Sequence, residues 1–94
     1  MNEKLICENN ILDYNYKYYL VKAPCNTDGN LNQNFKYGVK IDKYSVVGKI
    51  VDSKCVPHIF DTEEKMIKAI RIINKLQVTP ITLEDIVIDN VYSR

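Results

Sequence analysis

The chain has 94 residues and a formal net charge of +1, with 46% hydrophobic and 27% charged residues. This length makes a single domain, 1–94, and this composition is typical of a folded globular protein rather than a disordered one. The balanced charge argues against a protein that grips nucleic acid through its phosphates, which needs a marked basic excess, and against an acidic mimic of nucleic acid.

Nothing in the sequence indicates a membrane or secreted protein. No apolar run approaches the roughly 18 residues of a membrane span, and the N-terminal MNEKLICENN lacks the apolar core of a signal peptide. The cysteines Cys7, Cys25 and Cys55 are an odd number, which favours free thiols over a disulfide framework. We therefore expect a cytoplasmic protein with no membrane partner.

The first half of the chain predicts two strands. A short strand over Glu3–Cys7 and a turn are followed by Tyr14–Ala23, which is rich in aromatic and β-branched residues and alternates. Pro24 is expected to end this strand, since proline lacks a backbone donor. One face of the strand is predicted to carry Tyr14, Tyr16, Tyr18 and Leu20, and the other Asn15, Lys17, Tyr19 and Val21.

Further strands follow a polar loop over Cys25–Asn34. Lys36–Lys43 alternates cleanly, Val46–Asp52 does so less cleanly with a bulge at Gly48, and Ser53–Ile59 supplies a last extended piece. None of the connections could hold a crossover helix, so the sheet is expected to be antiparallel.

The segment Phe60–Leu76 has the pattern of an amphipathic helix, with Asp61 and Glu64 spaced as a capping box. Its apolar arc spans about 220°, far more than the roughly 100° that packing on one sheet requires. We expect a second cover, either the C-terminal segment or a second copy of the protein. The arc is made of Met66, Ile67, Ala69, Ile70, Ile72, Ile73 and Leu76.

A second helix is predicted over Thr82–Tyr92, although its β-branched run also suits a strand. The predicted class is therefore α+β: an antiparallel β-meander of three to five strands followed by two C-terminal helices packed on one face.

Several short motifs in this order resemble those of an uncharacterised family of small clostridial-type bacterial proteins, a domain of unknown function. They are YYLVK, then YGVKI with Tyr37-Gly38-Val39, then the helix, then TPITLEDIVID with Pro80, Leu83 and Asp85. The resemblance covers about residues 16–91. It implies the same order of elements, and it carries no activity, cofactor or substrate to this chain.

No constellation points to catalysis or to a metal. Cys55 and His58 form a C-x-x-H pair, but a closed zinc site needs four ligands, and no second pair is present. A cysteine nucleophile needs a base, and His58 is the only histidine. The acidic residues beside the helix starts stabilise helix dipoles. We expect no enzyme, no cofactor and no bound metal.

The tyrosines are the most suggestive feature, with seven in the chain and four between residues 14 and 19. They suit ordinary sheet packing, a protein interface or, less well given the balanced charge, the stacking of single-stranded nucleic acid. If their strand face is free, the interface candidates are Tyr14, Tyr16, Tyr18 and Tyr37.

The hypothesis drawn from the sequence is a non-enzymatic protein-interaction module, self-associating as a homodimer or adaptor-like. One alternative is an inhibitor of a host or defence protein, encoded by a phage or mobile element. Another is a small-ligand-binding protein or a thiol-based enzyme that uses Cys25, Cys55 and His58.

Overall fold

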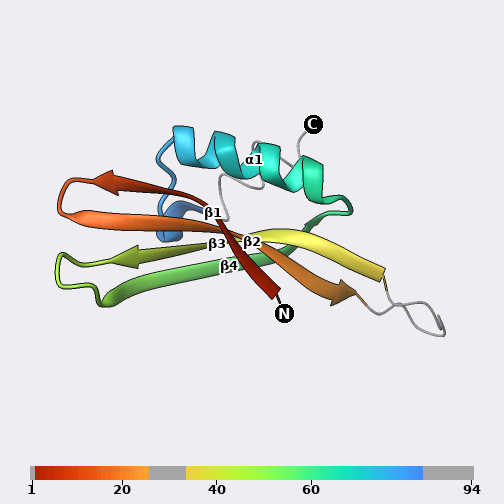
Figure 1. Cartoon of the computed structure of the whole chain (residues 1–94), viewed down its shortest axis with the longest axis horizontal. Helices are drawn as coiled ribbons and strands as arrows, with labels where there is room; N and C mark the ends of the chain where they lie inside the picture. Colours follow the sequence, from red (N-terminus) through yellow and green to blue (C-terminus); the bar gives the residue numbers. More distant parts are fainter. Residues whose placement is uncertain (1, 26–33, 84–94) are drawn as a thin grey trace.

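Four antiparallel strands form one sheet in sequence order, and a helix lies across one of its faces (Figure 1). The computed structural model describes residues 2–25 and 34–83. The strands are β1 (Asn2–Ile11), β2 (Tyr14–Cys25), β3 (Asn34–Tyr44) and β4 (Ile50–Phe60), followed by the helix α1 (Glu63–Lys75) and the 3₁₀ turn η1 (Pro80–Thr82).

The α+β class and the antiparallel meander are confirmed. The second predicted helix is not shown, because η1 ends at Thr82 and the rest of Thr82–Tyr92 lies almost wholly outside the described residues. The predicted polar loop over Cys25–Asn34 also lies outside them, apart from its two end residues, which belong to β2 and β3.

The core lies between the sheet and α1, on one of the two faces into which alternation divides β2. Tyr16, Tyr18 and Leu20 are buried there against Met66 and Ile70 of α1. Because successive side chains of a strand point to opposite faces, the residues between them in β2, such as Lys17 and Tyr19, lie on the far side of the sheet. The whole buried cluster is Tyr16, Tyr18, Leu20, Val39, Ile41, Met66, Ile70, Ile73, Val78 and Leu83.

Tyr18 ties β2 to the segment after α1. Its side chain is fully buried, and its hydroxyl donates a hydrogen bond of 2.9 Å to the carbonyl oxygen of Val78. A buried carbonyl without a donor would be costly, so this bond fixes where the chain turns back over the sheet. Burial, followed by the neighbouring Cys7 and Tyr16, raises the pKa of Tyr18 from 10.0 to about 12.

We expect Tyr18→Phe to lower the free energy of unfolding by about 1–2 kcal/mol, because the carbonyl of Val78 loses its donor. In the wild type, the folded state keeps the Tyr18 proton up to a pKa of about 12, whereas the unfolded state loses it near 10. This contribution to stability is therefore present below pH 10 and is lost as the pH rises to 12. Urea unfolding between pH 8 and 11 should show a weaker fall with pH in the variant; an equally steep fall would contradict the assignment.

The strand bounds differ from the predicted ones at Pro24. The residue does not end β2, which continues to Cys25, and Pro24 pairs with Phe35 of β3. The pairing of β1 with β2 begins at Asn2 opposite Lys22, so no described residue of β1 pairs with β2 beyond Lys22. A proline is tolerated on such an edge because no ladder donor is missing there.

The two predicted pieces Val46–Asp52 and Ser53–Ile59 are one strand, β4, preceded by a turn. Val46 and Val47 lie in that turn and not in a strand. Gly48 is in the left-handed region with φ 84° and marks the end of the turn, and not a bulge within a strand. The turn is closed by the backbone N–H of Gly48, which donates to Ser45 at 3.0 Å.

The predicted capping box of α1 is wrong. The helix begins at Glu63 with Thr62 as its N-cap residue, and no side chain makes a capping hydrogen bond there. The wide apolar arc predicted for α1 is only partly covered by the other described residues. Ile72 and Leu76, on one flank of the arc, remain 53% and 56% exposed.

Candidate functional site

The four tyrosines predicted as interface residues occupy three different places. Tyr16 and Tyr18 are 4% and 0% exposed beneath α1, so the free strand face on which their prediction depended is taken by the helix. Tyr14 lies near the hairpin turns and is 37% exposed. Tyr37 is half-buried near the start of α1.

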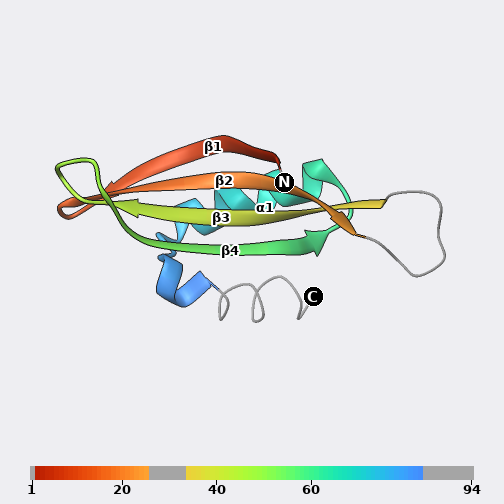
Figure 2. The same cartoon turned by 90° about the horizontal axis from the view of Figure 1, so that it is seen from below.

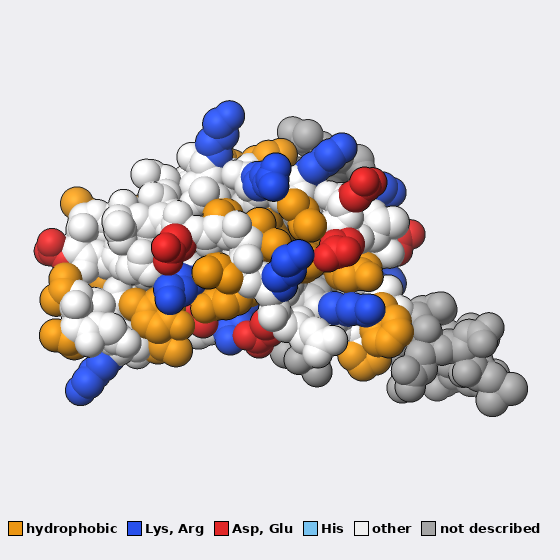
Figure 3. Space-filling view, viewed as in Figure 1, with side chains coloured by type: hydrophobic (Ala, Val, Ile, Leu, Met, Phe, Trp, Pro, Cys, Tyr) orange, Lys and Arg blue, Asp and Glu red, His pale blue; other side chains and the backbone are white. Residues whose placement is uncertain are grey.

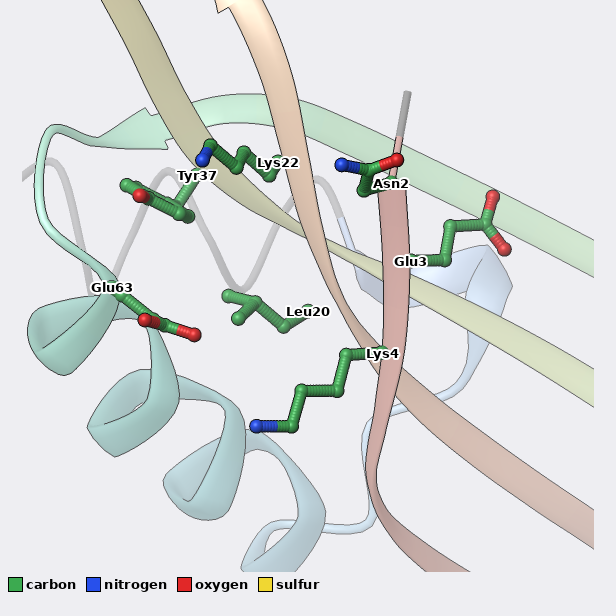
Figure 4. A pocket seen from close by; sticks show the side chains of 7 residues that line it. All are labelled: Asn2, Glu3, Lys4, Leu20, Lys22, Tyr37 and Glu63. Carbon is green, nitrogen blue, oxygen red and sulfur yellow. The ribbon is translucent and has the colours of Figure 1, made fainter.

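Tyr37 borders a shallow hollow of about 210 Å³ between the sheet and the first turn of α1 (Figure 4). Leu20 lies in its apolar part, and Lys4 and Glu63 bring opposite charges to its rim. Glu3 points away from it, because its carboxylate pairs with a lysine on the far side of the sheet. With Lys22, the hollow is lined by two lysines beside Glu63.

The sheet face opposite α1, which faces the reader in Figure 2, has no layer of described residues over it. The register places Lys17 opposite Asp42, and Tyr19 opposite both Lys40 and Leu5. Directly opposed residues in an antiparallel pair point to the same side, so these side chains share one surface. We call it the open face; it is formed by Leu5, Lys17, Tyr19, Lys40, Asp42, Tyr44, Ser53 and Cys55.

Asp42 is a buried acidic residue on the open face. It is only 3% exposed, although no described helix lies over this face. The hydroxyl of Ser53 donates to one carboxylate oxygen at 2.5 Å, and that of Tyr44 donates to the other at 3.4 Å. Lys40 lies 3.6 Å from the carboxylate and 3.0 Å from Glu3. The buried charge is therefore paired and hydrogen-bonded, as a stable buried carboxylate must be.

Two tyrosine rings on the open face are held by lysines. The ammonium of Lys40 lies 5.5 Å from the ring centre of Tyr19, and that of Lys17 lies 5.0 Å from the ring centre of Tyr44. Both are within the range of cation–π attraction. Burial and a hydrogen bond with Tyr44 raise the pKa of Tyr19 to about 12. Each of the two aromatic rings therefore has a lysine ammonium stacked against it.

At one end of the open face, β4 bends over β3. Tyr37 pairs with Phe60 and Val39 with Val56, so residues 57–59 stand opposite Gly38 alone. The side of Gly38 where a Cβ would stand is filled by the backbone of Val56 and Pro57. This bulge covers the open face beside Gly38, and its neighbour Val21 is fully buried there.

A second exposed surface lies at the two hairpin turns. Leu12, in the β1–β2 turn, is 94% exposed, and Val46 and Val47, in the β3–β4 turn, are 80% and 75% exposed. Asn10 and Ser45 line one hollow of about 340 Å³ together with Leu12 and Val46, so the two turns lie side by side. Figures 1 and 2 show both turns at the same end of the sheet. We call Leu12, Val46 and Val47 the hairpin tips.

Comparison with known proteins places the chain in a family. The model of a family of unknown function, DUF6514, matches residues 1–93. The chain belongs to DUF6514. No curated protein and no solved structure matches it. Membership confirms the resemblance to an uncharacterised family, and it assigns no chemistry to the residues of this DUF6514 chain.

The two thiols that the structure of this DUF6514 protein describes do not have the environment of nucleophiles. Cys7 and Cys55 are free and half-buried, and burial raises the pKa of each thiol. A reactive cysteine needs the opposite shift, towards the thiolate. In residues 2–25 and 34–83, no three His, Cys, Asp or Glu side chains come close enough to hold a metal ion. In the same part of the chain, no helix is both long and apolar enough to span a membrane.

Sequence reasoning placed the tyrosine candidates on the covered face and did not identify the open face or the hairpin tips. Both faces of β2 carry tyrosine, so alternation separates the faces without showing which one the helix covers. The sequence does indicate one of the two hairpin turns, because the adjacent residues Val46 and Val47 break the alternation just before Gly48.

Proposed function

We propose that this DUF6514 protein is a non-enzymatic, cytoplasmic protein-interaction module that binds a partner protein with its open face. The observation that carries the proposal is a sheet face with no covering layer of described residues, on which the rings of Tyr19 and Tyr44 are held in place by Lys40 and Lys17.

The composition of the open face supports a protein partner. Tyrosine is enriched in protein–protein interfaces because its ring buries a large area while its hydroxyl stays hydrogen-bonded. Ordering side chains on binding costs free energy, and cation–π contacts that already hold the rings reduce that cost.

The charges of the open face favour a protein partner over nucleic acid. Lys40 is paired with Glu3 and Asp42, and Lys17 lies opposite both Asp42 and Glu8 in the register. A phosphate backbone needs unpaired cations, because the release of its counterions drives the binding. Lysines that are already paired with acidic groups displace few counterions from a phosphate backbone.

A matched pair of variants tests the open face. Leu5→Ala/Tyr19→Ala removes a cross-strand pair from it, in which Leu5 is exposed and Tyr19 half-buried. Ile72→Ala/Leu76→Ala removes two exposed apolar side chains from α1, on the other layer. We expect affinity capture from the native host, read by mass spectrometry, to lose a specific partner with the first variant and to retain it with the second. The loss should be at least about tenfold, which corresponds to about 1.4 kcal/mol.

The controls separate the remaining outcomes. Light scattering of the purified protein shows whether the partner lost with the open-face variant is a second copy of the chain. Circular dichroism first establishes that both variants are folded. A partner that both variants retain, or retention of a single-stranded oligonucleotide in place of any protein, would overturn the proposal.

A further inference from the structure

The hollow beside Tyr37 has charged side chains on two sides of an apolar floor. Leu20, which is 4% exposed, forms the floor, and the half-buried ring of Tyr37 lies beside it. Lys4 and Lys22 extend from the sheet, and Glu63 extends from the first turn of α1 (Figure 4). Figure 3 shows basic, acidic and hydrophobic side chains next to one another in the half of the molecule where α1 begins. A molecule that enters the hollow therefore meets both signs of charge and an apolar surface.

The sheet does not neutralise the two lysines of the hollow. In the register, Lys4 lies opposite Leu20, and Lys22 lies between Asn2 and Tyr37. Directly opposed residues in an antiparallel pair point to the same side, so these are the cross-strand neighbours of the two lysines, and none of them is acidic. The sheet side of the hollow therefore carries two positive charges.

The helix side of the hollow carries one negative charge, that of Glu63. Glu3 also borders the hollow, but its carboxylate points away and lies 3.0 Å from the ammonium of Lys40. Asp61 and Glu64, near the start of α1, do not line the hollow. Within residues 2–25 and 34–83, Glu63 and the two lysines of the hollow form no ion pair with one another or with any other residue.

The size of the hollow limits what it can hold. Its volume of about 210 Å³ lies below the roughly 300–1,000 Å³ of sites that bind drug-sized ligands. A molecule with only a few non-hydrogen atoms fits such a space. To use both walls and the floor, this molecule needs a negative group, a positive group and an apolar body.

We propose that the hollow binds a small zwitterion with an apolar body, of which a free aliphatic amino acid is the simplest example. Lys4 and Lys22 attract the carboxylate of the ligand, Glu63 attracts its ammonium group, and its aliphatic side chain covers Leu20. A simple anion would be repelled by Glu63, and a simple cation by the lysines. The proposal does not depend on the open face, which lies on the other side of the sheet, so the two sites can be tested separately.

Titration of the full chain with L-leucine, followed through the amide NMR signals of Leu20 and Tyr37, tests the proposal. The matched probes are isocaproate, which is leucine without its amino group, and isoamylamine, which is leucine without its carboxylate. We expect saturable shifts with L-leucine at millimolar concentrations, because a ligand with so few atoms in an open hollow binds weakly. Each of the other two probes should bind at least about threefold more weakly, because it loses one charge contact and keeps one repulsion.

Variants of the two charged walls assign the contacts. Lys4→Gln/Lys22→Gln should weaken the binding of L-leucine at least about threefold, because the carboxylate of the ligand loses both cations. Glu63→Gln should remove the preference for L-leucine over isocaproate, because the carboxylate that attracts the amino group and repels the simple anion is gone. Lys65→Gln/Lys68→Gln, which removes two exposed lysines of α1 that do not line the hollow, should leave binding unchanged.

The amide spectrum of each variant first establishes that it is folded. The proposal is overturned if L-leucine causes no saturable shift, or if Lys4→Gln/Lys22→Gln binds it as tightly as the wild type does. It is also overturned if isocaproate binds the wild type as tightly as L-leucine, which would make the hollow a site for simple anions. A preference for L-leucine that persists in Glu63→Gln would overturn it as well.

Discussion

Replacement of Gly38 by alanine should lower the free energy of unfolding by about 3 kcal/mol or more. An ideal Cβ at this position would lie 2.0 Å from the carbonyl oxygen of Val56 and 2.5 Å from two backbone atoms of Pro57. Insertion of a methyl group into a packed site typically costs about 1–3 kcal/mol, and less when a side chain can rotate away. Here the obstacle is backbone, so the whole bulge of β4 over Gly38 must move.

Gly48→Ala is the matched control, because it changes the other described glycine. Gly48 has φ 84°, but no atom lies within 4 Å of the place where its Cβ would stand. Only the left-handed backbone opposes alanine there, at a cost of about 1–2 kcal/mol. Urea unfolding followed by tyrosine fluorescence measures both values. If Gly38→Ala costs no more than Gly48→Ala, β4 does not lie against Gly38 in solution.

The glycine of the Tyr37-Gly38-Val39 motif therefore has a structural explanation. In the sequence, this motif was noticed only as part of the resemblance to a family. The pattern of β3 alone does not show that the neighbouring strand β4 bends over Gly38. The three residues of β4 that lie opposite Gly38 include a proline and the chain's only histidine. The sequence around these two residues does not predict a bulge.

Local periodicity was a reliable guide in β2 and β3, which pair with each other without a register shift. The alternation of β2 predicted that Tyr18 and Leu20 share a face, and that of β3 predicted the same of Val39 and Ile41; all four are buried in the core. The prediction succeeds because a strand with one buried face must place an apolar residue at every second position. It fails in β4, where two irregularities in the pairing shift the side chains from one face to the other.

The candidate sites were harder to predict because they depend on which surfaces remain uncovered. Tyr16 and Tyr19 have the same residue type and lie on the same strand, yet one is in the core and the other on the open face. The sequence pattern predicts Asp42 as a polar residue on the exposed side of β3. In the structure it is buried, and the side chains of Ser53 and Tyr44 hydrogen-bond to its carboxylate. Contacts of this kind depend on register, which alternation alone does not give.

Replacement of Ile70 by alanine should lower the free energy of unfolding by about 2–5 kcal/mol, the usual cost of a large-to-small change in a packed core. Ile70 is fully buried at the centre of the contact between α1 and the sheet. Its neighbours there include Tyr18 and Met66, which are also fully buried, so little can move to fill the space. Chemical unfolding of the purified variant measures the loss.

Ile72→Ala is the control for this prediction, and it also tests the uncovered flank of α1. Ile72 lies on the same helix and loses the same atoms, but it is more than half exposed. Its replacement should cost less than about 1 kcal/mol, because most of the side chain already contacts water. A loss comparable to that of Ile70→Ala would show that the flank is covered in solution. If that loss grew with protein concentration, the cover would be a second copy, since only association makes stability depend on concentration.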